Sequence, residues 1–197
     1  NEDEIIQLNE TLQEKVRKRT FQLLKKNKEL KKLANFDSLT GLYNRGFLLN
    51  LASKYFDIAK RNNTSLFIIS FDLDHFKHIN DSYGHAMGDD VLKAFTQTVT
   101  PFMRNSDLFG RVGGEEFVAC IQNVKEEGAL LLAQKICKAI EKATFVFNDI
   151  TIHLTVSIGI AKLTNEKNID ELIEKSDKAM YQAKEAGRNQ VCSYKEA

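Results

Sequence analysis

The first 34 residues carry apolar side chains at helical spacing and contain neither Gly nor Pro, which predicts one long helix. The apolar stripe begins with Ile5, Leu8 and Leu12. From residue 16 onward the steps alternate four and three, the heptad rhythm of a coiled coil. These later positions are Val16, Thr20, Leu23, Asn27, Leu30 and Ala34. We therefore expect residues 1–35 to form a dimerisation helix.

Two features of this stripe indicate its partner and its behaviour. Leu23 and Leu30 fall at heptad position d and Asn27 at position a, and a lone Asn at a favours a parallel two-stranded coiled coil. Between Leu12 and Thr20 two successive steps of four interrupt the rhythm, as a stutter does. This predicts local unwinding, where a signal could change the helix register. The alternative is a solvated helix packed against its own domain.

The rest of the chain alternates helical and strand patterns. A turn around Gly41 leads into a helix at about residues 45–61, and the apolar run 65–71 predicts a central strand covered on both faces. A polar loop and a helix at about 88–103, broken near Pro101, come next. Later segments predict a hairpin of 108–112 and 117–121, a helix at 125–143, strands at 145–147 and 150–163, a helix at 169–186 and a strand at 190–194. This order predicts an α/β (α+β) fold, a mixed sheet flanked by helices.

Composition narrows the class of protein without deciding it. The 197 residues carry a net charge of +1, which argues against a protein that coats nucleic acid. Three cysteines without Cys-x-x-Cys spacing (Cys120, Cys137, Cys192) indicate neither a disulfide framework nor a zinc site, so we expect a reducing cytoplasm. No apolar run reaches the roughly 20 residues that span a bilayer. Because the first residue is Asn rather than Met, a longer protein could carry a membrane anchor, a sensor or a receiver domain upstream.

Acidic side chains stand at two points where strands are expected to end or begin. Asp72 and Asp74 close the apolar run of the central strand, while Glu115 and Glu116 follow the two glycines of the hairpin, where positive φ is accessible. A carboxylate such as Asp72 is costly to bury unless a cation compensates it. Strand-end carboxylates that face those of a hairpin tip would form an all-oxygen site suited to Mg²⁺. The alternatives are that Asp72 is a helix N-cap or a surface acid and that Asp74 caps the following turn.

The hairpin segment Gly113-Gly114-Glu115-Glu116-Phe117 resembles the signature of the GGDEF domain of diguanylate cyclases, in its GGEEF spelling. Further blocks at residues 37–45, 71–77, 80–89 and 183–189 follow in the family's order, so the resemblance covers about residues 36–194. It implies a GGDEF catalytic domain at 36–197 with a palm-like βαββαβ core. Val112 departs from the pattern, since Tyr is frequent there, but the change is conservative for a strand.

The resemblance implies a metal site of two Mg²⁺ or Mn²⁺ ions per active site. Asp72, the carbonyl of Leu73 and Glu115 correspond to the ligands of the first ion. Glu116 corresponds to a residue that serves a second ion or assists deprotonation, and the sequence leaves both roles open.

The resemblance also implies a phosphate site built from two distant segments. Backbone amides just after the acidic strand cradle the β- and γ-phosphates in the family, and two cations near the end of the last long helix grip them. Without the resemblance, those cations would be solvated side chains at a helix C-terminus. The corresponding residues are His75, Phe76 and Lys77, and Lys184 with Arg188, which we expect on one helix face because they are four apart.

Two further pairs correspond to nucleotide-reading positions. Asn80 and Asp89 match the residues that recognise guanine, and a carboxylate that accepts from the purine N1–H and exocyclic amine favours GTP. As an alternative, Asp89 or Asp90 could N-cap the following helix. Arg104 and Asp107 fit the Arg-x-x-Asp of the inhibitory product site, and they could instead be a surface ion pair.

The histidines do not indicate a metal site of their own. His75, His78 and His85 show no paired helical spacing, so hydrogen-bonding roles in loops are expected. His153 alternates with apolar neighbours and is expected to be structural in a strand.

The function that the resemblance implies is a homodimeric diguanylate cyclase, in which two GTP molecules held by facing protomers form cyclic di-GMP and two pyrophosphates under product inhibition. The rival is a non-catalytic GGDEF module that binds GTP or cyclic di-GMP as a receptor. A third possibility is a coiled-coil scaffold with a vestigial domain.

Overall fold

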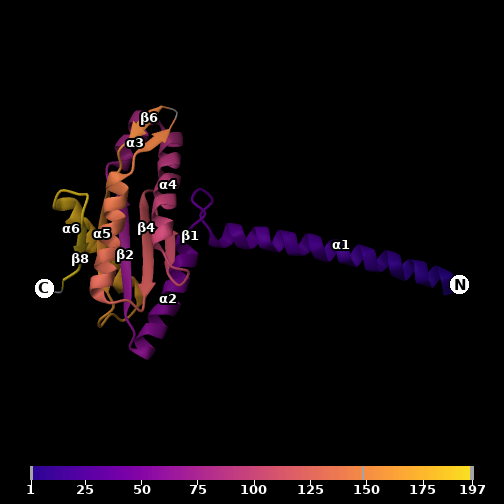
Figure 1. The fold of residues 1–197 in the computed structure, drawn as a ribbon. Coiled ribbons are helices and arrows are strands. Elements are labelled where there is room, and N and C mark those ends of the chain that lie inside the picture. Colours follow the sequence, from indigo (N-terminus) through magenta and orange to yellow (C-terminus); the bar gives the residue numbers. More distant parts are fainter. Residues whose placement is uncertain (1, 148, 196–197) are drawn as a thin grey trace.

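The computed structural model describes residues 2–147 and 149–195, apart from the side chains of residues 3–6. A helix-flanked mixed sheet forms the body, and the long helix α1 (Glu2–Asn35) projects from it (Figure 1). The predicted fold class is confirmed. After α1 the elements are β1 (Tyr43–Asn44), α2 (Arg45–Asn62), β2 (Leu66–Leu73), α3 (Phe76–Tyr83), α4 (His85–Val99), the 3₁₀ turn η1 (Thr100–Phe102), β3 (Leu108–Arg111), β4 (Glu116–Gln122), α5 (Glu126–Lys142), β5 (Phe145–Phe147), β6 (Ile150–Ile152), β7 (Val156–Lys162), α6 (Ile169–Glu185) and β8 (Val191–Ser193).

The strand β2 lies near the middle of a sheet whose order is β1-β3-β4-β2-β7-β8. It pairs antiparallel with β4 on one side and with β7 on the other. β3 and β4 form the predicted hairpin, and the outer strands β1 and β8 pair in parallel with β3 and β7. β5 and β6 form a separate two-stranded sheet. Every residue of β2 is buried, as its continuous apolar run predicts.

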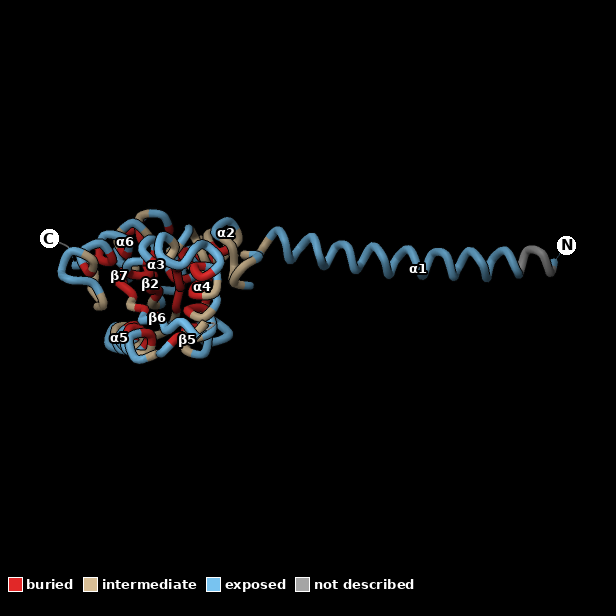
Figure 2. The backbone as a smooth tube through the Cα atoms, turned by 90° about the horizontal axis from the view of Figure 1, so that it is seen from above, coloured by how far each residue is buried: buried red, intermediate tan, exposed pale blue. Residues whose placement is uncertain are grey.

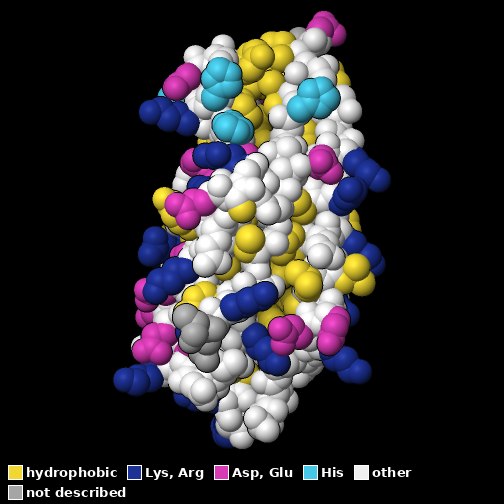
Figure 3. Space-filling model, turned by 90° about the vertical axis from the view of Figure 1, so that its left-hand side faces the viewer, with side chains coloured by type: hydrophobic (Ala, Val, Ile, Leu, Met, Phe, Trp, Pro, Cys, Tyr) yellow, Lys and Arg dark blue, Asp and Glu magenta, His cyan; other side chains and the backbone are white. Residues whose placement is uncertain are grey.

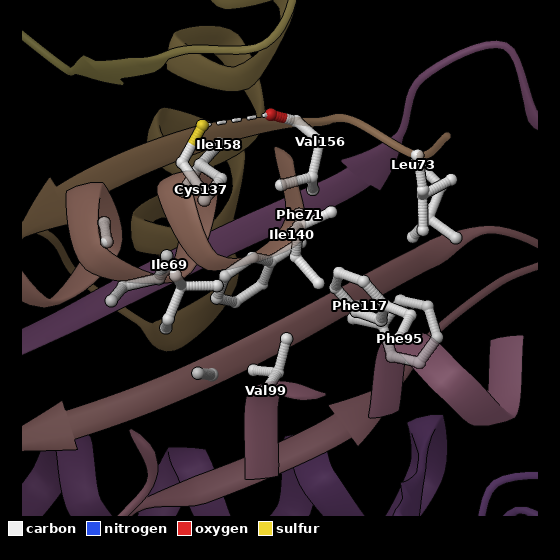
Figure 4. Close-up of a cluster of buried hydrophobic side chains, with 14 of the residues drawn as sticks. Ile69, Phe71, Leu73, Phe95, Val99, Phe117, Cys137, Ile140, Val156 and Ile158 are labelled. Carbon is white, nitrogen blue, oxygen red and sulfur yellow. Dashed lines mark hydrogen bonds between the residues drawn. The ribbon is translucent and has the colours of Figure 1, made fainter. Parts of the chain in front are cut away.

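The two faces of β2 bury different cores. Alternate residues such as Phe67, Ile69 and Phe71 pack with α4 and α5, and part of this cluster is shown in Figure 4. The intervening Leu66 and Ile68 pack with α2 and α6. Because side chains alternate along a strand, Ser70 and Asp72 continue the second series and face α6. The Ser70 hydroxyl accordingly lies 2.7 Å from that of Ser176 in α6.

Several predicted boundaries were wrong. The polar loop after β2 is helix α3, and α4 begins at His85 rather than at 88. Phe76 and Ile79, three apart, bury one face of this short helix, which its polar residues conceal in the sequence. The long strand predicted at 150–163 is divided into β6 and β7, so the exposed His153 lies between strands rather than in one.

Helix α1 stands apart from the body (Figure 2), and residues 7–34 are all exposed. This excludes the alternative of a helix packed on its own domain. The stripe residues Leu12, Leu23 and Leu30 are 58%, 67% and 65% exposed, so they are unpartnered within one chain. The side chain of Ile5, which begins the predicted stripe, is not among the side chains that the structure describes. Within the described residues, no helix has both the length and the apolar character needed to cross a bilayer.

Candidate active site

The tip of the β3–β4 hairpin is tightly bonded to itself. The amides of Val112 and Gly113 donate to the Glu116 carbonyl at 3.0 and 3.4 Å, and the Arg111 guanidinium donates to the carbonyls of Gly113 and Gly114 at 2.8–3.2 Å. The expected positive φ is absent from both glycines, although the structure describes them. A Cβ at residue 113 would lie 2.7 Å from Glu116 Oε2, the end of an exposed side chain, so a larger residue there would displace this carboxylate.

The register of the sheet brings the two acidic segments together. Asp72 of β2 lies directly opposite Glu116 of β4, and opposite residues of an antiparallel pair project from the same face. The Leu73 amide donates to the Glu115 carbonyl at 3.3 Å. Glu115 belongs to the turn, because β4 begins one residue later. The hairpin tip therefore adjoins the end of the central strand.

Electrostatics at Asp72 follow from this crowding. The residue is 5% exposed, and burial raises the pKa of its carboxyl group. Lys184 in the last turn of α6 opposes that shift, since its Nζ lies 2.7 Å from Asp72 Oδ2. The charges of Glu115 and Glu116 raise the pKa further, and the net shift is upward. Asp72 is thus neither an N-cap nor a surface acid.

The donor set suits a hard divalent cation. Asp72 pairs with Glu116 across β2 and β4, and Glu115 adjoins Leu73, so carboxylates of the kind that Mg²⁺ prefers are carried near the end of the strand. Across the described part of the chain, no three His, Cys, Asp or Glu side chains are already gathered closely enough to hold an ion. In this structure the Lys184 ammonium provides the compensating charge at Asp72.

The predicted phosphate-binding residues lie at two chain turns. His75 adopts a left-handed conformation with φ 58° and begins α3, whose first amides, like those of any helix, lack intrahelical acceptors. Arg188 does not share a helix face with Lys184 as predicted. α6 ends at Glu185, and Gly187 with φ 113° and Arg188 with φ 65° reverse the chain, so Arg188 is exposed beyond the helix.

The predicted guanine-reading residues Asn80 and Asp89 lie in α3 and α4, respectively. A Cβ at Gly88 in α4 would collide with Asn80 Oδ1 in α3, so the glycine permits the two helices to approach. Asp89 follows Gly88 and is exposed. Its alternative role as an N-cap is wrong, because α4 begins at His85 with Gly84 at the cap position.

Asp74 does not cap the following turn. It is 4% exposed and accepts hydrogen bonds from Thr155, Ser157 and the backbone of Asn189. No sequence pattern indicated this role, because its partners lie 81 to 115 residues away.

Arg104 and Asp107 lie at the opposite end of β3 from the hairpin tip. Asp107 Oδ2 accepts from the Arg104 amide at 2.8 Å, whereas Asp107 Oδ1 is buried without a hydrogen-bond partner. Burial and the nearby Asp107 carboxylate raise the pKa of the Cys120 thiol to about 12. A cavity of about 280 Å³ here is lined by Phe102, Arg104, Asp107, Ile121, Leu131 and Lys135. Arg104 and Asp107 thus both line a cavity at this end of β3.

An ion pair that the sequence did not reveal joins the hairpin to the segment after α1. The Arg111 guanidinium lies 3.3 Å from Asp37 Oδ1, which also accepts from the amide and hydroxyl of Thr40. Burial raises the pKa of Asp37, but the hydrogen bonds from Thr40 and the charge of Arg111 outweigh it, so the pKa is lowered. Asp37 and Arg111 are 74 residues apart, and no sequence pattern indicated their contact.

Charged side chains of both signs are interspersed over the face seen in Figure 3, and histidines gather toward the end where α3 and β6 lie. His75, His78 and His85 are exposed.

Comparison with known proteins decides the family. The family described as "Diguanylate cyclase, GGDEF domain" matches residues 34–190. The chain belongs to this family. Among curated relatives of this GGDEF protein, Diguanylate cyclase A of Treponema denticola is 31% identical over 169 residues, which cover 84% of this chain and 46% of the relative. Probable diguanylate cyclase DgcF of Escherichia coli is 34% identical over 80% of this chain and 51% of its own. The GGDEF chain thus spans about half the length of these relatives.

Solved structures agree with this family. The GGEEF domain of a diguanylate cyclase from Vibrio cholerae, described as active, has a TM-score of 0.73 and 35% identity over 78% of this GGDEF chain and 98% of its own. The coiled coil and GGDEF domain of DgcB from Caulobacter crescentus, solved with c-di-GMP, has a TM-score of 0.88 over 93% of this chain and 98% of its own. Its 22% identity makes it a likeness of fold.

Proposed function

We propose that this chain is a diguanylate cyclase that condenses two GTP molecules into cyclic di-GMP and two pyrophosphates. The observation that carries the proposal is the register that sets Glu116 opposite the buried Asp72, with Glu115 beside it and Lys184 paired to it. The functional acids are all present in a chain of this family. A receptor or a vestigial scaffold would not need a carboxylate whose pKa is raised by burial and by two further acids.

The donor set fits Mg²⁺ or Mn²⁺. Asp72, the Leu73 carbonyl and Glu115 would hold one ion and Glu116 would either hold a second or accept a proton. Two such ions supply positive charge that lowers the pKa of an attacking 3′-hydroxyl and neutralises the departing pyrophosphate. The raised pKa of Asp72 supports this assignment, because a buried carboxylate beside two others gains from a compensating cation.

The chain's own groups would bind and orient GTP. The first amides of α3, at His75, Phe76 and Lys77, point toward the β- and γ-phosphates, and Lys184 and Arg188 add charge. Asn80 and Asp89 read guanine by hydrogen bonds that adenine cannot return. The 3′-oxygen of one GTP attacks the α-phosphorus of the other while the bond to the bridging oxygen breaks and pyrophosphate leaves. The 3′-oxygen of the second GTP then attacks the α-phosphorus of the first in the same way, which closes the ring and releases the second pyrophosphate.

Dimerisation follows from this stoichiometry. If each protomer holds one GTP, the two sites must face each other, and a parallel coiled coil of residues 1–35 raises their effective concentration. The exposed heptad stripe of α1 supports this arrangement. The domain at 36–197 would then respond to changes in helix register. GTP as substrate and the free cysteines favour the cytoplasm.

Product inhibition would act through Arg104 and Asp107. The unpaired Asp107 Oδ1 is an acceptor suited to a guanine N–H, and Arg104 is exposed for phosphate. Cyclic di-GMP bound between domains would hold the two active sites apart.

The deciding experiment incubates the purified chain with GTP and Mg²⁺ at concentrations that saturate dimer formation, and follows pyrophosphate and cyclic di-GMP by chromatography. Glu115→Gln should abolish both products. Glu126→Gln is the matched control, because Glu126 is an exposed acid paired with Lys162 at the start of α5, and it should remain fully active. Wild-type protein that binds GTP without releasing pyrophosphate would favour the receptor function.

A further inference from the structure

Asp74, the residue after β2 (Leu66–Leu73), has both carboxylate oxygens occupied by donors from distant segments. The Thr155 hydroxyl donates to Oδ2 at 2.7 Å, the Ser157 hydroxyl to Oδ1 at 2.7 Å and the Asn189 amide to Oδ2 at 3.0 Å. Its own amide donates to the Thr155 carbonyl at 3.0 Å. These bonds tie the end of β2 to β7 and to the turn that follows α6.

Three residues next to these bonds adopt left-handed backbone conformations. His75 follows Asp74 directly and has φ 58°, while Arg188 and Asn189 have φ 65° and 46°. A left-handed conformation is unfavourable for residues other than Gly, least so for Asn and His, and the surroundings must hold it in place. Asp74 is covalently joined to the first of these turns and hydrogen-bonded to the second, so one buried side chain supports both.

We propose that Asp74 is the positioning residue that holds the two halves of the polyphosphate site in register: the first turn of α3 and the turn carrying Arg188. This inference rests on the proposed function, because it takes those two segments to bind the phosphates of GTP. Asp74 touches neither substrate nor metal in this role.

Asp74 acts as a hydrogen-bond acceptor, and its charge is secondary. In Asp74→Asn the remaining oxygen can accept from Thr155 and Asn189, and the new NH₂ can donate to the Ser157 hydroxyl, which accepts as well as it donates. Asp74→Ala removes every acceptor and leaves these donors buried without partners. Asn should therefore rescue what Ala destroys. A metal ligand would show no such rescue, since an amide replaces a carboxylate poorly in a magnesium site.

The matched control is Glu166, a second buried carboxylate just beyond the other end of β7. It is 2% exposed and accepts from the Thr164 amide, the Thr164 hydroxyl and the Lys175 ammonium. Glu166→Ala thus removes a comparable buried acceptor away from the proposed phosphate site. Any effect common to both Ala variants reports general destabilisation.

The first readout needs no nucleotide. Hydrogen exchange of the free protein should accelerate in the peptide covering residues 186–191 in Asp74→Ala, and should stay at the wild-type rate in Asp74→Asn and Glu166→Ala. Unchanged exchange in Asp74→Ala overturns the inference. If Asp74→Ala does not fold, Thr155→Val is used instead, because it removes one donor from Oδ2 and should also accelerate exchange in the peptide covering residues 186–191. An unchanged exchange rate of this peptide in Thr155→Val would likewise overturn the inference.

The second readout separates phosphate grip from base recognition. A GTP analogue with a methylene group between the α- and β-phosphates should bind Asp74→Ala about tenfold or more weakly, whereas GMP should lose much less, because misplaced phosphate donors act only on the polyphosphate. Equal losses for both ligands, or losses as large in Asp74→Asn, contradict a positioning role. A wild-type chain that does not bind the analogue would contradict the proposed function. The hydrogen-exchange measurement would still test whether Asp74 holds the turn at residues 186–191.

Discussion

At the scale of single residues, the ionised Asp72 carboxylate lowers the stability of the fold. Its neighbours Glu115 and Glu116, together with burial, outweigh Lys184 and raise its pKa from the ordinary 3.8. A group with a raised folded-state pKa loses its proton first in the unfolded chain, so ionisation opposes folding as pH rises between the two values. Natural proteins retain such costs where a reaction needs the charge.

Asp72→Asn should therefore make the protein more stable and inactive. At pH 7 we expect a gain on the order of 1 kcal/mol in the free energy of unfolding, measured by urea denaturation without divalent cations. The gain should shrink as the pH falls from the raised folded-state pKa toward 3.8, and it should vanish below 3.8, where the wild-type carboxyl group is protonated in both states. Asp57→Asn, an exposed change in α2, should show no such gain. A loss of stability at pH 7 would show that the Lys184 ion pair outweighs burial.

Arg104→Ala should relieve product inhibition while leaving synthesis intact. Arg104 is exposed and lines the same cavity as Asp107, at the end of β3 away from the acids. Initial rates without product should match wild type, and the concentration of cyclic di-GMP that halves the rate should rise by roughly tenfold or more, since a charge-assisted contact is lost. Arg61→Ala, an exposed change in α2, should leave inhibition unaltered. Inhibition that survives Arg104→Ala would place the product elsewhere.

At the scale of elements, Arg111 joins the hairpin tip to the segment after α1. One guanidinium donates to the carbonyls of Gly113 and Gly114 and contacts Asp37. Because a guanidinium is a planar fork, it can hold these acceptors together, which an ammonium cannot. The tip that carries Glu115 is thereby fixed to the base of the long helix.

Arg111→Lys should keep the charge and lose this geometry. We expect synthesis to fall by about tenfold or more, because a small misplacement of catalytic groups is costly. Arg61→Lys should be silent. The lowered pKa of Asp37 adds a stability effect: the pair stabilises the fold above pH 3.8, and this contribution is lost as the pH falls through the lowered value. Full activity in Arg111→Lys would show that the tip holds its shape without the fork.

The same scale shows what the sequence could predict. Strongly periodic elements such as α2, α5 and α6, and the buried strand β2, agree with the predicted segments to within a few residues. Helix α3 was missed because only Phe76 and Ile79 are apolar and buried in it. The turn at Arg188 was missed because left-handed residues other than Gly leave no pattern. Adjacent acids could be expected from strand ends, whereas the contacts of Asp74 depend on tertiary pairing alone.

At the scale of the whole molecule, the described apolar side chains of α1 pack against nothing within a single chain. It leaves the body at Asn35, and large apolar side chains along it are exposed. A polar helix of this kind gains little stability in water without a partner. The heptad stripe is the pattern of a two-stranded coiled coil, which supports the proposal that a second copy is the partner. With one GTP held by each protomer, as proposed, that partner would be necessary for reaction.

Leu23→Glu should convert the dimer to a monomer and make synthesis depend on protein concentration. Two glutamates facing each other at a d position repel and lose buried apolar area, so sedimentation should report monomer at micromolar concentration. Phe21→Glu is the matched control: Phe21 is 71% exposed against 67% for Leu23 but lies off the stripe, so the dimer should persist. Activity per protomer in Leu23→Glu should fall by about 100-fold and recover in proportion to concentration, because encounter replaces tethering. Equal effects of both substitutions would refute this register, and a fully active monomer would refute the facing-site mechanism itself.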